Sequence, residues 1–335
     1  MPVYNAEEFV RRAVESAVDQ EEVGEIILID DAGPDKSLSI CQRLEREFGK
    51  VRLFRHPDHK NHGAGASRNL GIERARYGLV AFLDADDYYL PNRFKRDGEI
   101  LLADASVDGV YSAIGVHYES EEARQKFLAA GYGYQEFLTL TRPVPPEELP
   151  EVLLHCHSEV TGEFHTNAIT VRKPLFDRSG LFNERLRLRQ DIHLWLRMAA
   201  VGRLVPSSID KAVAMRGVHL ENRMTDGEEH RKYVDYWWRN LDNWFQSTPD
   251  VSKRASRAFN RAYCQYQIKH RSKREARKAF LGHVSKHPKL ILQSMGFFDL
   301  NLFEVFGRNW LTLHLTSAKN RVVTAVHAPD TDSIH

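Results

Sequence analysis

The chain has 335 residues, of which 42% are hydrophobic and 28% are charged, and its formal net charge is +1. This ordinary globular composition predicts one large α/β domain with an appendage, or two modest domains, and argues against disorder. The balanced charge gives no reason to expect a nucleic-acid partner, and no apolar run approaches the roughly 20 residues that a membrane-spanning helix needs.

The first residues are typical of the exit from a strand into a helix. The segment Met1–Asn5 precedes Phe9, Ala13 and Ala17, which stand at helical spacing, and Asn5 is the expected N-cap. Because no strand-forming run precedes this turn, we expect a short apolar strand to be encoded upstream of Met1 or to have been lost.

Strand and helix patterns then alternate along the first half of the chain. Strand patterns at 25–31, 51–54, 79–83 and 107–116 are separated by helical patterns at 35–48 and 64–77 and by a helix that Pro91 opens. This order predicts βαβ units and a Rossmann-like, mainly parallel sheet flanked by helices. In such a sheet, ligands bind at the carboxyl ends of the strands.

Two acidic clusters fall at that edge of the predicted sheet. Asp30 and Asp31 end one strand, and Asp84 to Asp87 follow another. Carboxylates this close repel one another unless a cation lies between them, and Mg²⁺ or Mn²⁺ suits such oxygen ligands together with substrate phosphates. Taken alone, the second cluster is equally well explained as a solvated turn.

A small-residue loop, Gly63 to Asn69, opens the next predicted helix. Small residues let the backbone approach a ligand closely, and Arg68 within the loop is placed to reach a phosphate or a base. Glycine before a helix often serves only to form the turn, so this loop alone is weak evidence for a ligand site. The two acidic clusters predicted at the same edge of the sheet make a ligand site a stronger interpretation.

In order and spacing, these segments resemble the motifs of family 2 glycosyltransferases with the GT-A fold. The matching segments are Pro2-Val3-Tyr4-Asn5, Asp30-Asp31, Gly65-Ala66-Ser67-Arg68-Asn69 and Leu83-Asp84-Ala85-Asp86-Asp87. The resemblance runs from Met1 to about residue 225. It implies a GT-A domain over 1–225 and leaves a mainly helical C-terminal region over 226–335.

The resemblance also implies roles for individual residues. The nucleotide, whose base is commonly uracil, would be bound by residues of the first turn and of the second strand end: Pro2, Val3, Tyr4, Asp30 and Asp31. Arg68 would contact the base or a phosphate, and Asp84 and Ala85 would lie against the ribose or the sugar. Asp86 would bind Mn²⁺ or Mg²⁺.

The second half of the chain supplies a candidate general base. Asp191 stands at the start of a predicted helix, just before Leu194 and Trp195. A carboxylate there is also a favourable helix cap, but the resemblance implies that Asp191 is the catalytic base. Family members carry an acidic pair at this point, and Gln190 departs from it.

Two further segments carry polar candidates. In the family, a histidine on a loop completes the metal or diphosphate shell, which implies that role for His219, with Arg216 beside it. His165, Thr166 and Asn167 precede a predicted strand. They are expected either to contact an acceptor hydroxyl or to satisfy backbone groups at the strand end.

The resemblance implies an inverting transfer of a sugar from a nucleoside-diphosphate donor, with uridine diphosphate favoured, to a hydroxyl of a glycan or lipid-linked acceptor. Polysaccharide or cell-surface glycan synthesis is the expected setting. Two alternatives remain: an inactive sugar-nucleotide or glycan-binding protein of the same fold, and a nucleotidyltransferase.

The C-terminal region is predicted to be helical and becomes basic over 253–278. This segment is expected to be a solvated helical face, a peripheral contact with anionic lipid, or a surface for homo-oligomerisation. Three cysteines far apart in the sequence predict reduced thiols. The expected location is therefore the cytoplasm, with the inner face of the membrane as the alternative.

Overall fold

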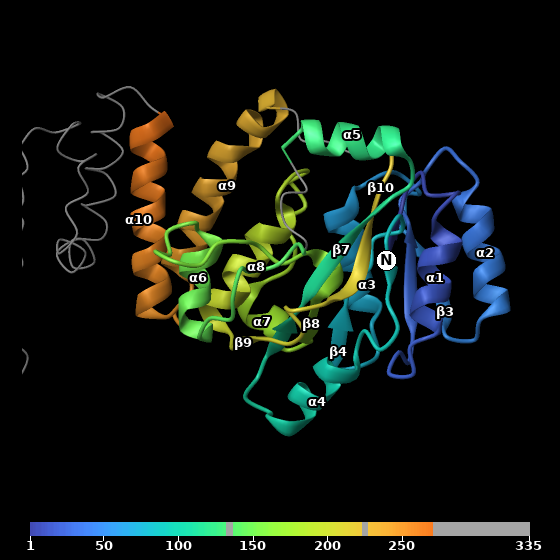
Figure 1. Cartoon of the computed structure of the whole chain (residues 1–335), viewed down its shortest axis with the longest axis horizontal. Coiled ribbons are helices and arrows are strands. Elements are labelled where there is room, and N and C mark those ends of the chain that lie inside the picture. The colour runs from blue at the N-terminus through green and yellow to red at the C-terminus, as the bar shows by residue number, and fades with distance from the viewer. Residues whose placement is uncertain (132–136, 223–226, 271–335) are drawn as a thin grey trace, which may run out of the picture. The chain divides into compact units, whose positions relative to one another are not determined.

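The computed structural model describes residues 1–131, 137–222 and 227–270 (Figure 1). Contacts divide the chain into two compact units, Met1–Ala255 and Ser256–His335. The part of the predicted helical region from residue 271 onward lies outside the described residues. Within the described ranges, every helix is too short or too polar to cross a membrane.

A parallel three-stranded sheet forms the N-terminal part of the first unit. Its strand order is β1-β2-β3, and two helices, α1 and α2, follow the first two strands. The bounds of these elements are β1 Pro2–Val3, α1 Val10–Val18, β2 Ile26–Asp30, α2 Ser37–Glu47 and β3 Val51–Arg55. The two residues of β1 pair with Ile29 and Asp30, so the turn after them stands at the carboxyl end of β2. The expectation of further strand residues upstream stays a prediction.

The prediction that Asn5 caps the first helix is wrong. Helix α1 begins at Val10 with Phe9 as its N-cap residue, and Asn5 adopts a left-handed backbone with φ of 51°. The physical reason is a separate turn, in which the carbonyl oxygen of Ala6 accepts hydrogen bonds from the amides of Phe9 (3.0 Å) and Val10 (2.9 Å). This turn places Phe9 ahead of the helix, beside the candidate site.

Two mixed sheets complete the strand core of the first unit. One has the order β4-β8-β6-β9 and the other the order β5-β10-β7. Their strands are β4 Leu79–Ala81, β5 Tyr88–Tyr89, β6 Gly109–Tyr111, β7 Ala113–Tyr118, β8 Ile169–Arg172, β9 Leu204–Pro206 and β10 Ala212–Val218. Four of the seven strand pairs in the described residues are parallel, which confirms a mainly parallel α/β architecture.

The single strand predicted over 107–116 is instead two strands in different sheets. The break between them falls at Ser112, which is fully buried. The Ser112 amide donates to the Ala168 carbonyl (2.9 Å), and its hydroxyl accepts from the Ser208 amide (3.2 Å). Both partners are far away in sequence, so the local pattern could not reveal the break.

The remaining helices of the described residues cover these sheets or follow them. They are α3 Ala64–Arg74, α4 Lys95–Ala103, α5 Glu121–Ala129, α6 Leu149–Leu153, α7 Leu175–Ser179, α8 Gln190–Val201, α9 Gly227–Ser247 and α10 Lys253–His270, with the 3₁₀ turns η1 Pro146–Glu148 and η2 Thr166–Ala168. The prediction that Pro91 opens a helix is wrong, because the helix in this region, α4, begins at Lys95. The left-handed backbone of Asn92, with φ of 61°, delays α4 to Lys95.

Helix α8 lies in the core. Every residue from Ile192 to Ala200 is buried, and the Trp195 ring packs against Phe82, Phe164 and Phe182. Since a helix buried on all sides cannot rotate freely, the first turn of α8 has a fixed direction. That turn carries Asp191, the predicted base.

Candidate active site

Asp31 organises the loop that leads into α3. Its carboxylate accepts hydrogen bonds from Asn61 Nδ2 (2.9 Å) and from the amides of His62 (2.7 Å) and Gly63 (2.9 Å), and it is only 2% exposed. The neighbouring Asp30 carboxylate accepts from Arg55 Nε at 2.9 Å. Both acids are thus engaged by protein donors, and their predicted contact with a nucleotide base stays a prediction.

The first turn presents one accessible aromatic ring. Val3 is fully buried and Pro2 is half-buried, whereas Tyr4 is 50% exposed directly after β1. An exposed ring at the carboxyl end of a strand is a suitable stacking surface for a planar base. Among the three residues predicted here, Tyr4 is therefore the one whose side chain is available to a ligand.

Arg68 and Asp84 form a partly buried ion pair just after β4, in which the Arg68 side chain is 6% exposed and the Asp84 side chain 25%. Arg68 Nη2 lies 2.5 Å from Asp84 Oδ1, and the guanidinium stands 5.4 Å from the centre of the Phe182 ring. Burial raises the pKa of the Asp84 carboxyl, but Arg68 and nearby His165 outweigh it, so the pKa lies below its usual value. Asp84 is therefore held as a carboxylate, and Ala85 beside it is buried.

Asp87 is a structural acid that fastens the acidic turn. Its buried carboxylate accepts from the Gly217 amide (2.7 Å) in β10 and from Asn167 Nδ2. Burial and the carboxylates of Asp86 and Asp84 raise the pKa of Asp87 well above its usual value. These bonds tie the turn to two segments that come much later in the chain.

Asn167 holds both ends of the same turn. While its Nδ2 donates to Asp87, its Oδ1 accepts from the backbone amide of Asp84 at 3.0 Å. The side chain is fully buried. Of the two roles left open for this residue, the geometry supports the satisfaction of backbone groups.

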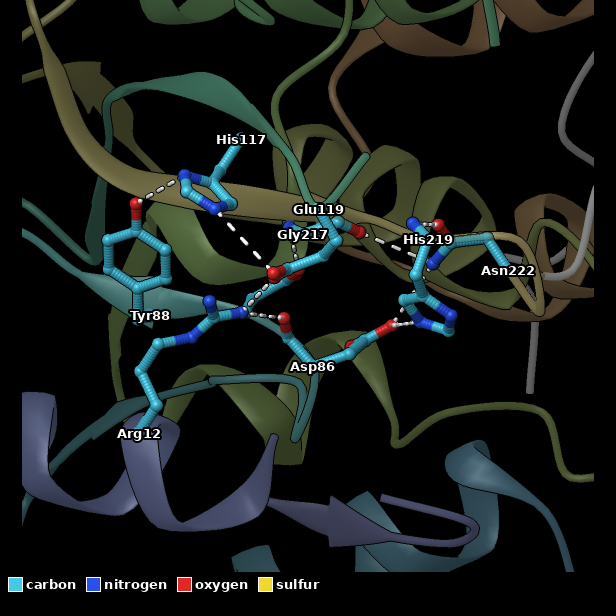
Figure 2. Close-up of polar contacts among 9 residues, drawn as sticks. Arg12, Asp86, Tyr88, His117, Glu119, Gly217, His219 and Asn222 are labelled. Atoms are coloured by element: carbon cyan, nitrogen blue, oxygen red, sulfur yellow. Dashed lines mark hydrogen bonds and ion pairs between the residues drawn. The ribbon is translucent and has the colours of Figure 1, made fainter. Parts of the chain in front are cut away.

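The predicted metal ligands Asp86 and His219 come together (Figure 2). His219 Nε2 lies 3.4 Å from Asp86 Oδ2, and Asn222 Nδ2 lies 3.3 Å from the same oxygen. The Phe9 ring stacks on the His219 ring with their centres 4.6 Å apart. Gly217 permits this approach, because a Cβ at that position would lie 2.2 Å from the Asp86 carbonyl oxygen.

Arg12 braces the opposite side of Asp86, a role that the sequence reasoning missed. Its Nη2 lies 2.5 Å from Glu119 Oε1 and 3.4 Å from the Asp86 carbonyl oxygen, and its guanidinium stands over the Tyr88 ring at 4.8 Å (Figure 2). Helical spacing places Phe9 and Arg12 on one face near the start of α1. This spacing could have indicated from the sequence that Phe9 and Arg12 lie on the same side of the helix. It could not indicate what Arg12 contacts, because Asp86, Tyr88 and Glu119 are distant in sequence.

Asp191 lies in the first turn of α8, as predicted. Its Oδ1 accepts from the amide of Ile192 at 2.9 Å. Arg189, the residue that precedes α8, has a left-handed backbone with φ of 53°, and its carbonyl oxygen accepts from Trp237 Nε1 at 3.1 Å. Helix α9 therefore contacts the residue immediately before α8.

The start of α8 is close to α3 and lies within electrostatic reach of a histidine near the acidic turn. A Cβ at Gly65 in α3 would lie 2.1 Å from Gln190 Oε1, so the first turns of α3 and α8 are in close contact. Burial lowers the pKa of the His165 imidazole, although the nearby carboxylates of Asp84 and Asp191 act in the opposite direction. His165 thus lies within electrostatic reach of both predicted functional acids.

A second group of side chains could also hold a cation. One ligand atom each from Asp84, Asp87 and His165 lie within 4.8 Å of one another. However, Asp84 already pairs with Arg68, and both oxygens of Asp87 accept protein hydrogen bonds. Asp86 and His219 fit a cation better, since two ligands of one Mg²⁺ or Mn²⁺ stand about 3 Å apart.

Comparison with known sequences identifies related proteins. A family model described as glycosyl transferase family 2 matches residues 1–148. The succinoglycan biosynthesis protein ExoU of Rhizobium meliloti is 29% identical over 205 residues, which cover 59% of this chain and 55% of that protein. The uncharacterised glycosyltransferase EpsJ of Bacillus subtilis is 27% identical over 194 residues, covering 57% of this chain and 52% of EpsJ. The chain thus spans about half the length of these relatives.

Comparison with solved structures supports the fold. The crystal structure of S. aureus TarS 1–349 in complex with UDP-GlcNAc superposes with a TM-score of 0.60 at 15% identity, covering 97% of this chain and 90% of that one. The complex of TarS 1–349 with UDP has a TM-score of 0.56 at 18% identity, covering 80% and 70% of the two chains. At these identities, the likeness concerns the fold alone.

Proposed function

Because the chain belongs to glycosyltransferase family 2 and has the GT-A fold, we propose that it transfers a sugar from a nucleoside-diphosphate donor to an acceptor hydroxyl. Two pairs in and beside the acidic turn support this proposal: the Arg68–Asp84 ion pair and the Asp86–His219 pair. Asp191, at the start of α8, is the third proposed member of the site. His165 is under the influence of both Asp84 and Asp191.

The proposed donor is a UDP-sugar and the proposed acceptor a glycan or a lipid-linked glycan. The relatives support a role in polysaccharide synthesis, since their names include a succinoglycan biosynthesis protein and a putative teichuronic acid biosynthesis glycosyltransferase, TuaG of Bacillus subtilis. Arg68, buried near the start of α3, would lie beside the donor phosphates. The exposed Tyr4 ring would stack on the base.

We propose that Asp86 and His219 bind Mn²⁺ or Mg²⁺. A carboxylate with an imidazole is a donor set that suits Mn²⁺, and the pair lies on a surface that a diphosphate can reach, because the Asp86 side chain is 34% exposed. When bound, such an ion neutralises negative charge on the diphosphate leaving group. Arg12, Phe9 and Asn222 orient the two ligands.

The proposed reaction is a single displacement with inversion at the anomeric carbon. The Asp191 carboxylate accepts the proton of the acceptor hydroxyl while the hydroxyl oxygen forms a bond to the anomeric carbon. The bond between that carbon and the diphosphate oxygen breaks, and its electron pair leaves with the diphosphate. The buried body of α8 holds Asp191 in place during this step.

The enzyme is proposed to act in the cytoplasm or at the inner face of the membrane. The basic helix α10 would rest on anionic headgroups in the second case, or would mediate homo-oligomerisation. Liposome flotation with anionic and neutral vesicles separates the two, because only lipid contact depends on vesicle charge.

Replacing the proposed base tests the catalytic assignment. We expect Asp191→Asn to lower kcat about 10²- to 10⁴-fold and to leave donor binding nearly unchanged, because the amide cannot accept the proton. Transfer from UDP-sugars in the presence of Mn²⁺ is measured by release of UDP. Asp177→Asn is the matched control, since Asp177 is an exposed acid in the first turn of α7. Full transfer by Asp191→Asn would rule out its role as the base.

A further inference from the structure

A cavity of about 90 Å³ lies beside the start of α8 in the first unit. Three segments line it: residues 153–155 at the end of α6, Leu188 and Arg189 before α8, and one face of α9 formed by Tyr233, Val234, Trp237 and Trp238. Since one enclosed water needs roughly 10–15 Å³, the cavity has space for about six to nine waters, which is comparable to one sugar ring. The cavity therefore borders the helix whose first turn carries the proposed base.

The α9 side of the cavity is aromatic. The Trp237 and Trp238 rings stand nearly perpendicular, with their centres 5.0 Å apart and their planes at 82°. Trp237 is buried and its indole N–H is bonded to the Arg189 carbonyl oxygen, so this ring is held in place, whereas Trp238 and Tyr233 are half-buried. A ring face is apolar and carries partial negative charge, which suits the C–H groups on one face of a sugar ring.

Two polar side chains line the same cavity and share one carboxylate partner. His155 Nε2 and Arg189 Nη2 lie 3.0 Å and 3.2 Å from the same oxygen, Glu163 Oε1. Burial raises the pKa of Glu163, but His155 and Arg189 outweigh it, so the pKa lies below its usual value. Within the described ranges, Glu163 Oε2 accepts no hydrogen bond. That oxygen can accept from a hydroxyl, and a hydroxyl can in turn accept from a guanidinium.

His155 and Arg189 have the same unusual backbone conformation. Each is left-handed with φ of 53°, which is uncommon for residues other than glycine. Both backbones are fixed by hydrogen bonds, because the His155 amide donates to the Val152 carbonyl at 2.9 Å and the Arg189 carbonyl accepts from Trp237. Such strain persists where the surrounding structure enforces it, and it clusters at sites that hold a ligand. The two residues therefore present their side chains from fixed backbone positions.

The polar cluster is linked to the proposed reaction centre by two short segments. Arg189 stands two residues before Asp191, and Glu163 stands two residues before His165. His165 lies within electrostatic reach of both Asp84 and Asp191. A ligand that contacts Arg189 and Glu163 would therefore lie close to the proposed base.

We propose that this cavity binds one uncharged sugar ring of the acceptor, with the Trp238 ring against the face of the sugar and Glu163 and Arg189 at its hydroxyls. The proposal rests on the proposed function, because the bound sugar is taken to carry, or to adjoin, the hydroxyl that Asp191 deprotonates. Because Glu163 balances the charge of Arg189, the cluster carries no excess positive charge to attract an acidic sugar. Recognition would come from stacking and from neutral hydroxyl contacts.

Ligand-observed NMR titration with the methyl glycosides of glucose, galactose and mannose tests the site without any donor. We expect at least one of them to bind the full chain more tightly than the methyl glycoside of glucuronic acid. Trp238→Ala should weaken this binding by about tenfold, because the stacking ring is lost, and Trp238→Phe should retain most of it. Trp244→Ala, later in α9 and outside the cavity lining, is the matched control, and Tm shows whether each variant is folded.

Three results would overturn the proposal. The first is that none of the three glycosides binds, and the second is that a folded Trp238→Ala binds as tightly as the unaltered protein. The third is that n-octanol and n-octyl glucoside bind while the methyl glycosides do not, since the cavity would then take a lipid chain. Tighter binding of the glucuronic acid glycoside would contradict the assignment of an uncharged sugar.

The transfer reaction separates this proposal from the proposed function. In the presence of a UDP-sugar and Mn²⁺, Trp238→Ala should raise the KM for the bound glycoside by about tenfold and change the KM for the UDP-sugar much less. Glycoside binding without any release of UDP would contradict the transferase function and leave the sugar site standing. Release of UDP without glycoside binding would support the transferase function and overturn the sugar site.

Discussion

Asp86 and Asp87 are adjacent in sequence but have opposite surroundings. Asp86 faces solvent beside His219, whereas Asp87 is buried and accepts two hydrogen bonds from the protein. A carboxylate with free oxygen lone pairs can bind a cation. A carboxylate whose oxygens already accept hydrogen bonds from the protein stabilises the local fold instead. The two residues are therefore expected to respond differently to substitution.

We expect Asp86→Ala to weaken Mn²⁺ binding by about tenfold or more, because the substitution removes the proposed direct ligand. Asp58→Ala, at an exposed surface acid, is the control and should leave Mn²⁺ binding unchanged. Isothermal titration with Mn²⁺ alone gives the affinity. If Asp87→Ala abolishes binding in a folded protein while Asp86→Ala does not, the cation belongs to the Asp84, Asp87 and His165 group instead.

Gly217 should be intolerant of any side chain. A Cβ there would lie 2.2 Å from the Asp86 carbonyl oxygen, so Gly217→Ala must displace the acidic turn. We expect a loss of kcat/KM of about tenfold or more, since a small misplacement near the chemistry costs up to about 100-fold. Gly98→Ala is the control, because nothing lies within 4 Å of a Cβ at that position. Equal activity of the two variants would contradict this expectation.

At the scale of elements, the junction between α8 and α9 controls the direction of the proposed base. The left-handed Arg189 precedes α8, and the indole N–H of Trp237 in α9 is bonded to its carbonyl oxygen. Trp237 is buried and also packs edge-on against His193. A helix that follows the strand core in sequence thus fixes the start of the helix that carries Asp191.

We expect Trp237→Phe to lower kcat several-fold with little change in the KM for the donor, because the ring remains and only the hydrogen bond is lost. That bond is worth about 1 kcal/mol, or roughly fivefold. Trp244→Phe, later in the same helix, is the control. A fall in Tm without any change in kcat would show that Trp237 acts only through stability.

The elements that sequence predicts well are those whose signals are local. The strand expected at 25–31 is observed at Ile26–Asp30, and the helix expected at 35–48 is observed at Ser37–Glu47. The break at Ser112 depends on bonds to Ala168 and Ser208, and Asn167 bonds to residues about 80 positions earlier. Local periodicity contains no information on such partners, so the break at Ser112 and the roles of Asn167 and Arg12 required the structure.

At the scale of the whole first unit, Glu25 connects segments from three parts of the chain. Its carboxylate accepts from Arg52 Nη1 (2.9 Å), from the Arg76 amide (2.7 Å) and from Arg76 Nε (2.9 Å). Burial raises the pKa of Glu25, but these donors outweigh it and hold the pKa below its usual value. A depressed pKa in the folded state contributes stability above the unfolded pKa, and this stability is lost as pH falls through the folded value.

We therefore expect Glu25→Gln to lower Tm at pH 7 and to make Tm less sensitive to acid, in the range below the ordinary glutamate pKa of about 4.3. Thermal unfolding at a series of pH values measures both effects. Glu122→Gln, at an exposed acid in the first turn of α5, is the control. An unchanged acid dependence in Glu25→Gln would contradict this account.

The amide of Asn167 has a consequence for how this protein can vary. The planar amide group of this one side chain bonds to the backbone of Asp84 and to the carboxylate of Asp87. The distance between these two bonded groups is therefore fixed by the size of the amide group. Substitutions within that segment can be accommodated, but an inserted or deleted residue would separate the two bonded groups. Over evolutionary time, the four residues from Asp84 to Asp87 should therefore keep a constant length, even where neighbouring loops gain and lose residues.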